Sequence, residues 1–290
     1  MRSKLFVPGS RPELFPKALA SETDAISIDL EDSVVAEHKS SARSTVTDFL
    51  QSSAAQATSK ALIVRVNALD TPYFEADVMA VVRPGLTLLN LPKVECAADV
   101  RAAVAAMERA ESRNGVRVQL KILANIETPK GLLNAAQIGM ADARVAGLQL
   151  GLADLFEPLG IDRRDARHVH ATLFALRMAA AEAGVFAYDA AFSNVRDPDG
   201  YRAEAQMAHS LGYLGKSCIH PSQIALANEV FRPSDADITA AQRILAAVQA
   251  EQGQGAGALL VDGKMVDAPF VRRAQQIIEI AKKMGLVDHE

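Results

Sequence analysis

The residues best suited to chemistry are two acids, Glu127 and Asp154, and each follows a short apolar stretch with the pattern of a β-strand. If these stretches are neighbouring parallel strands, both carboxylates lie at the same edge of the sheet and close together. Carboxylate oxygens with room for water and substrate oxygens are the ligands that Mg²⁺ prefers. We therefore predict a Mg²⁺ site at this pair. For either acid alone, a charge that favours a helix N-terminus is an equally good interpretation.

A second charged group consists of Arg65 and the acidic segment Asp29–Asp32. Arg65 ends an apolar strand, where an unpaired guanidinium would be too costly to bury, so it must meet an anion. That anion could be Glu31 or Glu127, or a carboxylate or enolate oxygen of a substrate. We expect Glu31 or Asp32 to orient an arginine or metal-bound waters. A solvated loop in which Asp32 caps a helix is the simpler alternative.

Short apolar stretches alternate with alanine-rich amphipathic ones, which predicts repeated strand–helix units and a parallel α/β sheet. Eight strands favour a closed (β/α)8 TIM barrel, and their nearly continuous apolar character indicates burial on both faces. The active site of such a barrel lies at the carboxyl ends of its strands, where the charged residues fall. The predicted strands are Leu5–Val7, Ala25–Asp29, Leu62–Val66, Thr87–Leu91, Gln119–Asn125, Val145–Leu150, Val185–Tyr188 and Lys216–Ile219.

The pattern changes near residue 232. A helix over 234–251, a short strand over 259–261 and a helix over 268–284 predict a C-terminal helical arm. We therefore expect a barrel domain over 1–232 and an arm over 233–290. The glycine-rich stretch 253–258 lacks a preceding strand and a following helix, so a hinge is a better interpretation of it than a phosphate-binding loop.

Composition excludes several classes of protein. The chain has 290 residues with 31 basic and 35 acidic side chains and no long run of one sign, so no nucleic-acid partner is expected. Cys96 and Cys218 lie far apart and fit no metal-ligand spacing, which favours a reducing compartment. No signal-peptide core or membrane-spanning run is present, so we predict no membrane association and a cytoplasmic location.

Taken together, the motifs resemble the citrate lyase β-subunit-like branch of the HpcH/HpaI aldolase family. The resemblance implies a Mg²⁺-dependent lyase that cleaves a carbon–carbon bond in a β-hydroxyacyl-coenzyme A thioester of the malyl-CoA or citramalyl-CoA type. The products would be acetyl-CoA and an α-keto acid, formed through an enolate. Seven motifs in order along almost the whole chain carry the resemblance: Arg2–Pro12, Asp29–Val34, Val64–Asn67, Leu91–Glu95, Ile126–Gly131, Gly215–Gln223 and Asp262–Asp267.

The resemblance also implies roles for single residues. Glu127 and Asp154 would bind Mg²⁺, and Arg65, with Glu31 beside it, would hold the thioester or enolate oxygen. Asp267 would act as acid and base from an arm that closes as a lid over a neighbouring subunit's site, which implies a homotrimer or hexamer. Residues on the coenzyme A side would be Phe6, Arg11, Lys17 and Pro221. From the sequence pattern alone, Arg11 and Lys17 are ordinary surface charges.

Three alternatives remain open: a β subunit that cleaves citryl-acyl-carrier protein within a citrate lyase complex, a malyl-CoA thioesterase on the same fold, and a non-catalytic metabolite-binding barrel. The acyl group (malyl, citramalyl, methylmalyl or citryl) is not specified, because one methyl contributes only about 1–3 kcal/mol to discrimination. Two departures from the family pattern, Ala153 and the stretch Ala190–Ser193, fall where they could alter the acyl pocket.

Overall fold

The computed structural model describes residues 1–251 and 259–288, which belong to two compact units, Met1–Phe231 and Arg232–Glu290. The glycine-rich stretch 253–258, interpreted above as a hinge, lies outside the described residues. Within the described part of the chain, no helix is long and apolar enough to cross a membrane.

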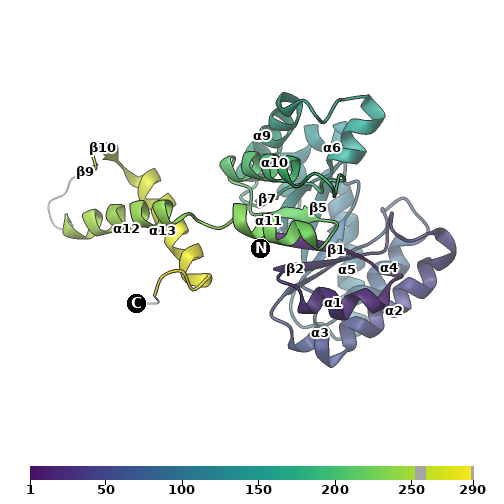
Figure 1. The fold of residues 1–290 in the computed structure, drawn as a ribbon. Coiled ribbons are helices and arrows are strands. Elements are labelled where there is room, and N and C mark those ends of the chain that lie inside the picture. The colour runs from purple at the N-terminus through teal and green to yellow at the C-terminus, as the bar shows by residue number, and fades with distance from the viewer. Residues whose placement is uncertain (252–258, 289–290) are drawn as a thin grey trace. The chain divides into compact units, whose positions relative to one another are not determined.

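Eight parallel strands form the first unit, in the order β7-β6-β5-β4-β3-β2-β1-β8, and helices cover their outer face (Figure 1). Hydrogen bonds from Asp189 N to Gly215 O (2.9 Å) and from Ser217 N to Asp189 O (3.2 Å) join the two ends of the sheet. The predicted (β/α)8 barrel is therefore confirmed. Its strands are β1 (Ser3–Pro8), β2 (Ala25–Asp29), β3 (Ala61–Arg65), β4 (Leu88–Leu91), β5 (Lys121–Ile126), β6 (Val145–Leu150), β7 (Phe186–Tyr188) and β8 (Lys216–Cys218).

Helices connect successive strands, and the long amphipathic ones follow the sequence pattern. The helix that covers 198–210 begins at Pro198, because Asp197 Oδ1 accepts a hydrogen bond from Gly200 N (2.8 Å) and proline suits the first helical turn. The helices are α1 (Phe15–Ala20), α2 (Lys39–Gln51), α3 (Ser53–Ala57), α4 (Phe74–Val81), α5 (Ala97–Asn114), α6 (Pro129–Leu133), α7 (Ala135–Gly139), α8 (Leu152–Phe156), α9 (Ala166–Glu182), α10 (Pro198–Ser210) and α11 (Ser222–Val230), with short 3-10 turns η1 (Pro12–Leu14), η2 (Ala36–His38) and η3 (Glu157–Leu159).

The interior of the barrel changes from apolar to charged toward the carboxyl ends of the strands. Alternate residues of a strand point to the same face, and along β2 to β5 such alternate positions change from apolar to polar. An apolar cluster forms the floor: Ala25, Ile63, Leu88 and Leu123. Buried polar side chains follow two residues later in β2, β4 and β5, at Ser27, Asn90 and Asn125. Gln149 is buried with them, and its Oε1 accepts hydrogen bonds from Lys4 and Asn90. The sequence pattern of apolar strands did not indicate this polar level. Asp29 and Arg65 are the last residues of β2 and β3 and lead into the loops.

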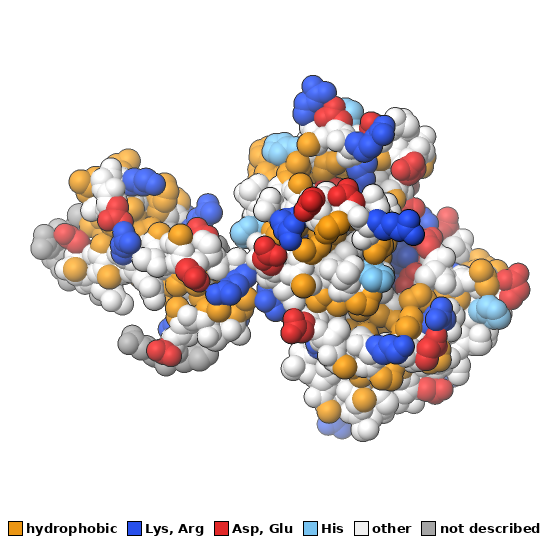
Figure 2. Space-filling model, in the orientation of Figure 1, with side chains coloured by type: hydrophobic (Ala, Val, Ile, Leu, Met, Phe, Trp, Pro, Cys, Tyr) orange, Lys and Arg blue, Asp and Glu red, His pale blue; other side chains and the backbone are white. Residues whose placement is uncertain are grey.

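The second unit contains two helices that pack on each other, α12 (Asp235–Ala250) and α13 (Ala268–Lys283), and an antiparallel hairpin of β9 (Leu259–Val261) and β10 (Lys264–Val266). Asp262 and Gly263 form the hairpin turn with φ of 49° and 76°. Strand β10 was not predicted, since three residues show no clear alternation. Four large apolar side chains of the arm are exposed: Leu260, Met265, Phe270 and Ile280. Figure 2 shows orange, apolar patches on the surface of this unit.

Candidate active site

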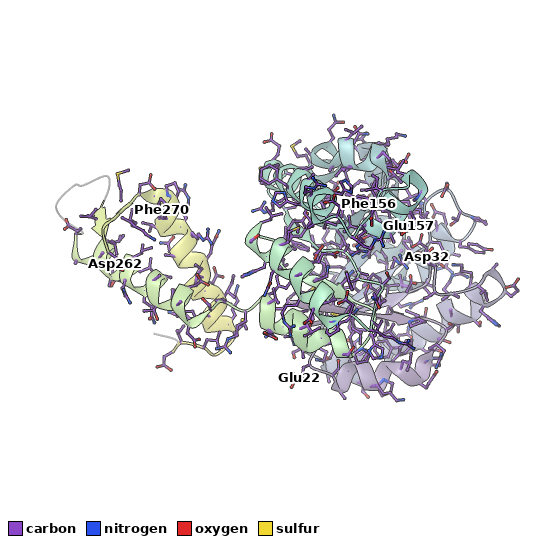
Figure 3. The ribbon with its side chains drawn as sticks, turned by 45° about the horizontal axis from the view of Figure 1, so that its top comes forward. Glu22, Asp32, Phe156, Glu157, Asp262 and Phe270 are labelled. Carbon is purple, nitrogen blue, oxygen red and sulfur yellow. The ribbon has the colours of Figure 1, made fainter. Side chains whose placement is uncertain are left out.

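Arg65 ends β3, Glu31 and Glu127 lie in the loops after β2 and β5, and Asp154 lies in the first turn of the helix after β6. Figure 3 marks two of these loops by Asp32, which follows β2, and by Phe156 and Glu157, which follow β6. Since all eight strands are parallel, the loops after β2 to β6 belong to one end of the barrel.

Arg65, the last residue of β3, is held by three carboxylates. Its Nε lies 2.7 Å from Asp29 Oδ1 and its Nη2 lies 2.9 Å from Asp29 Oδ2, which is a two-pronged interaction. Nη1 lies 2.8 Å from Glu31 Oε2 and 3.2 Å from Asp32 Oδ2. The ring of Phe6 lies against the guanidinium, 5.2 Å from Cζ to the ring centroid. The expectation that Arg65 meets acids holds, but its main partner is Asp29, and Glu127 is not among them.

Charge compensation differs between the two acids nearest to Arg65. Burial alone would raise the pKa of Asp29, but the charge and hydrogen bonds of Arg65 outweigh it and hold that pKa below its ordinary value. Burial raises the pKa of Glu31, although Arg65 and Lys93 oppose the rise. Burial lowers the pKa of Arg65 less than its acidic partners raise it, so its guanidinium stays charged. Asp29 thus fixes Arg65, while Glu31 carries a charge that is only partly compensated.

Glu127 is buried where the chain leaves β5, and two neighbours define its position. Its Oε1 accepts a hydrogen bond from Lys93 N at 2.7 Å. On the other side it lies against Gly151, where a β carbon would come within 2.6 Å of Glu127 Cβ and 2.5 Å of Oε2. Burial raises the pKa of Glu127 to about 7, and the nearby charges of Glu31 and Asp154 contribute to the rise. The charged form of this carboxylate is therefore disfavoured mainly by burial and additionally by two neighbouring acids.

Asp154 lies in the first turn of α8, immediately after β6, and its side chain is exposed. Strands β5 and β6 are paired, with Ile126 opposite Leu150, so the residues that follow them are neighbours. The effect of Asp154 on the pKa of Glu127 agrees with this proximity. Within residues 1–251 and 259–288, no group of three or more His, Cys, Asp or Glu side chains is arranged to hold a metal ion. The barrel thus offers a cation one buried carboxylate, Glu127, and one exposed carboxylate, Asp154.

Two residues of this site were not identified from the sequence as members of it. Asp29 was noted only as part of an acidic segment, although its place at the end of β2, opposite Arg65 in the register, was a usable signal. Lys93 donates its backbone N–H to Glu127 and places Nζ 2.9 Å from Glu31 Oε1. Its side chain resembled any surface lysine after a strand. Lys93 links the two groups of acids.

The residues expected on the coenzyme A side lie in or after two paired strands, β1 and β8. Phe6 is in β1 and half-buried, with its ring between the Lys4 ammonium (4.2 Å) and Arg65. Arg11 and Lys17 follow β1 and are exposed, with Arg11 paired to Glu13, and Pro221 follows β8 and is also exposed. The four residues belong to adjacent strands and loops, and their role stays a prediction.

Asp267 belongs to the second unit, at the N-terminal end of α13. Its backbone is extended, as in an N-cap residue, yet its side chain makes no capping hydrogen bond. Its Oδ1 is buried without a hydrogen-bond partner among the described residues. Aspartate is one of the best N-cap residues and buried oxygens are rarely left unpaired. This carboxylate is therefore not used for the local structure.

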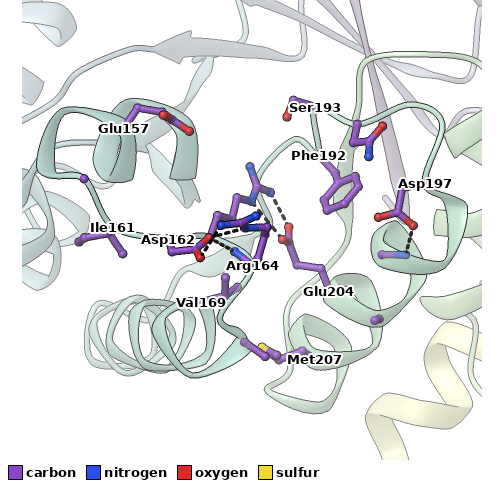
Figure 4. A pocket seen from close by; sticks show the side chains of 16 residues that line it. Glu157, Ile161, Asp162, Arg164, Val169, Phe192, Ser193, Asp197, Glu204 and Met207 are labelled. Atoms are coloured by element: carbon purple, nitrogen blue, oxygen red, sulfur yellow. Dashed lines mark hydrogen bonds and ion pairs between the residues drawn. The ribbon is translucent and has the colours of Figure 1, made fainter.

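A cavity of about 790 Å³ lies between the loops that follow β6 and β7, walled by α9 and α10 (Figure 4). Phe192 and Ser193, from the stretch that departs from the family pattern, line it. Arg163 also lines it but is held by Glu204 and by Ala191 O (2.6 Å). Glu127, Asp154 and Arg65 do not line this cavity. It is a separate feature of the barrel from the acidic site.

Comparisons with known proteins identify relatives that match almost the whole chain. The chain is 36% identical to a citrate lyase subunit beta from Leuconostoc mesenteroides subsp. cremoris, over 100% of this chain and 96% of the relative. It is 35% identical to an L-malyl-CoA/beta-methylmalyl-CoA lyase from Rhodobacter capsulatus, over 97% and 94%. Among solved structures, protein CitE from Mycobacterium tuberculosis in complex with magnesium, acetoacetate and coenzyme A matches with a TM-score of 0.74 and 32% identity, over 97% of this chain and 99% of that one.

Residues 2–221 match the family described as HpcH/HpaI aldolase/citrate lyase. The resemblance stated from the sequence motifs is thereby confirmed. This chain belongs to the HpcH/HpaI aldolase/citrate lyase family.

Proposed function

We propose that the protein is a Mg²⁺-dependent lyase that cleaves a β-hydroxyacyl-CoA thioester of the malyl-CoA or citramalyl-CoA type into acetyl-CoA and an α-keto acid. The observation that carries this proposal is the carboxylate pair Glu127 and Asp154, set beside the fixed guanidinium of Arg65. Full-length similarity to a malyl-CoA lyase and to a structure containing magnesium and coenzyme A supports it.

The site fits a divalent cation. Five carboxylates gather here: Asp29, Glu31, Asp32, Glu127 and Asp154. Arg65 and Lys93 form ion pairs with some of them, and Lys4 and Lys39 lie nearby. Burial, with the added charges of Glu31 and Asp154, raises the pKa of Glu127 to about 7, so a cation at this carboxylate would favour its charged form. Mg²⁺ is commonly held by one or two carboxylates while keeping several waters, which matches one buried and one exposed acid. Glu127 and Asp154 would be the protein ligands. When bound, Mg²⁺ supplies Lewis-acid stabilisation of the negative charge that develops on a substrate oxygen.

Arg65 is arranged to stabilise an enolate oxygen. Asp29 accepts hydrogen bonds from Nε and from one N–H of Nη2, and Glu31 and Asp32 form ion pairs with Nη1. These interactions on three nitrogens hold the guanidinium in one orientation. The second N–H of Nη2 has no acceptor within the described residues and is available to a thioester oxygen. A donor that is already oriented needs no reorganisation when charge develops, which is the most effective form of electrostatic catalysis. Glu31 acts by holding Arg65.

Asp267 is the proposed acid and base. Its side chain makes no capping hydrogen bond and its Oδ1 is unpaired. As the neutral carboxyl it would give its proton to the enolate carbon and become the carboxylate, and in the condensing direction the carboxylate would remove that proton. The apolar residues exposed on the arm, among them Met265 and Phe270, support docking on another surface. We propose that this surface belongs to a second subunit of a homotrimer or hexamer, where the arm closes as a lid. Sedimentation analysis of the purified protein tests the assembly.

The thioester would enter from the side of β1 and β8. Arg11 and Lys17 are exposed cations suited to the phosphates of coenzyme A, with Phe6 and Pro221 beside them.

The protein lacks a disulfide, since Cys96 and Cys218 are both free, which supports the proposal that it works in the reducing cytoplasm.

A second candidate is the β subunit of a citrate lyase complex, which would cleave citryl-acyl-carrier protein. It is favoured by the 36% identity to such a subunit over the whole chain, practically the same as the 35% identity to malyl-CoA lyase. A thioesterase on the same site would use the same acids but direct water to the thioester carbon.

One experiment separates these functions. The purified protein is incubated with Mg²⁺ and, in parallel, malyl-CoA, citramalyl-CoA, β-methylmalyl-CoA, citryl-CoA and citryl-acyl-carrier protein, and products are identified by mass spectrometry. The proposal expects acetyl-CoA and a keto acid from a malyl-type or citramalyl-type thioester, and no product with EDTA. Preference for the carrier-protein substrate would favour the citrate lyase subunit. Free coenzyme A without acetyl-CoA would show a thioesterase, and no product from any substrate would refute all three.

A further inference from the structure

Lys93 has a backbone conformation that its residue type disfavours. Its φ is 51°, in the left-handed region, and Asp262 is the other non-glycine residue with positive φ in the described part of the chain. Asp262 lies in a hairpin turn, where aspartate tolerates this conformation. Lys93 has no such local reason. Strain of this kind persists only where the surroundings fix it, and it concentrates at functional sites.

The backbone N–H and the side-chain ammonium of Lys93 each bind an acid of the proposed active site. Its backbone N–H lies 2.7 Å from Glu127 Oε1, and its Nζ lies 2.9 Å from Glu31 Oε1. The next residue, Val94, donates its N–H to Asn125 O of β5 at 3.2 Å, which anchors the turn to the strand that carries Glu127. The left-handed turn therefore delivers an N–H group to one oxygen of the buried carboxylate.

We propose that Lys93 is a positioning residue that makes Glu127 a ligand through one oxygen only, and that this favours Mg²⁺ over Ca²⁺. The inference rests on the proposed Mg²⁺ site. Oε1 is engaged by Lys93, whereas Oε2 has no hydrogen-bond partner within the described residues. Mg²⁺ requires near-ideal octahedral geometry with short ligand distances, while Ca²⁺ accepts more ligands and carboxylates bound through both oxygens. A hydrogen bond to Oε1 uses one of its lone pairs and draws it toward the Lys93 N–H, which favours cation binding through Oε2 and so suits the first requirement better than the second.

Gly151 supports the same orientation from the opposite side. A β carbon at this position would lie 2.5 Å from Glu127 Oε2 and 2.6 Å from Glu127 Cβ. The side chain of Glu127 therefore lies directly against the backbone at the end of β6, and cannot turn further in that direction. Lys93 and Gly151 together leave Glu127 one orientation.

The test compares substitutions at Lys93 that differ in backbone preference. Lys93→Asn and Lys93→Val both remove the ammonium, but asparagine tolerates the left-handed conformation and a β-branched side chain resists it. Binding of Mg²⁺ and of Ca²⁺ to EDTA-treated full-length protein is measured by titration calorimetry. We expect Lys93→Asn to keep the Mg²⁺ affinity of the wild type within about threefold. Lys93→Val should bind Mg²⁺ about tenfold more weakly, with little change for Ca²⁺.

Each outcome decides. Equal Mg²⁺ affinities for Lys93→Val and Lys93→Asn would overturn the positioning role. If both variants bind Mg²⁺ more weakly than the wild type by the same factor, the loss is due to removal of the ammonium. If the wild type binds Mg²⁺ and Glu127→Gln does not, the proposed function stands whatever Lys93 does. If the wild type binds no Mg²⁺, both proposals fall. Should Lys93→Val not fold, Lys93→Ala compared with Lys93→Gly repeats the test with a smaller steric change, glycine binding Mg²⁺ more tightly.

Discussion

Replacing Glu127 by glutamine should stabilise the metal-free protein at alkaline pH. The pKa of Glu127 rises from its ordinary 4.5 to about 7 in the folded chain, mainly through burial and then through Glu31 and Asp154. Between these values the folded state holds a proton that the unfolded state has lost, so stability falls as pH rises. A tenfold change in proton affinity corresponds to about 1.4 kcal/mol, so the whole shift corresponds to about 3 kcal/mol. Glutamine has the same shape and can accept the Lys93 N–H, but carries no charge.

The assay is urea unfolding in EDTA at several values between pH 4.5 and pH 8. Glu127→Gln should match the wild type near pH 4.5 and exceed it by up to about 3 kcal/mol at pH 8. Glu37→Gln, at an exposed acid, serves as the matched control and should show no such trend. Mg²⁺ at about 100 times its dissociation constant should add about 2.7 kcal/mol to the wild type and nothing to Glu127→Gln. A stability difference independent of pH would refute the reasoning about buried charge.

Three further substitutions test other parts of the site. In Arg65→Lys the charge is kept, but lysine cannot bind both oxygens of Asp29, so we expect a loss of about 1–3 kcal/mol in unfolding free energy and little cleavage activity. Turnover at the wild-type rate would remove Arg65 from the mechanism. Asp267→Asn should bind Mg²⁺ and thioester normally in calorimetry while cleavage falls greatly, and normal cleavage would exclude Asp267 as acid and base. Gly151→Ala places a β carbon against Glu127 Oε2. The φ of residue 151 is −115°, which alanine adopts without strain, so Mg²⁺ affinity should fall about tenfold or more for steric reasons alone. An unchanged affinity would contradict the close packing of Glu127 against Gly151.

The barrel could be predicted because its determinants are local. Each strand is a short apolar stretch bounded by polar or glycine-containing segments, and eight such stretches at regular spacing leave few other arrangements. Glu127 and Asp154 could be placed together for the same reason, since adjacent parallel strands bring the residues that follow them to one end. The requirement that a buried guanidinium be paired also predicted acidic partners for Arg65.

The details of the site depend on contacts between residues far apart in the chain, which periodicity does not show. Asp29 becomes the main partner of Arg65 because β2 and β3 pair with these residues opposite each other. Lys93 contributes a backbone N–H through a left-handed conformation that lysine rarely adopts. The polar level inside the barrel, for example Lys4 against Gln149, was hidden because single polar residues interrupt strands that are otherwise apolar.

The central claim is that Glu127 and Asp154 together hold one divalent cation. Anomalous X-ray scattering from crystals soaked in Mn²⁺, a substitute for Mg²⁺ with the same preference for oxygen ligands, tests it most directly. The account predicts one strong peak at about 2.0–2.3 Å from a carboxylate oxygen of each acid, which disappears in Glu127→Gln. A peak elsewhere in the protein, or one that persists in Glu127→Gln, would contradict it.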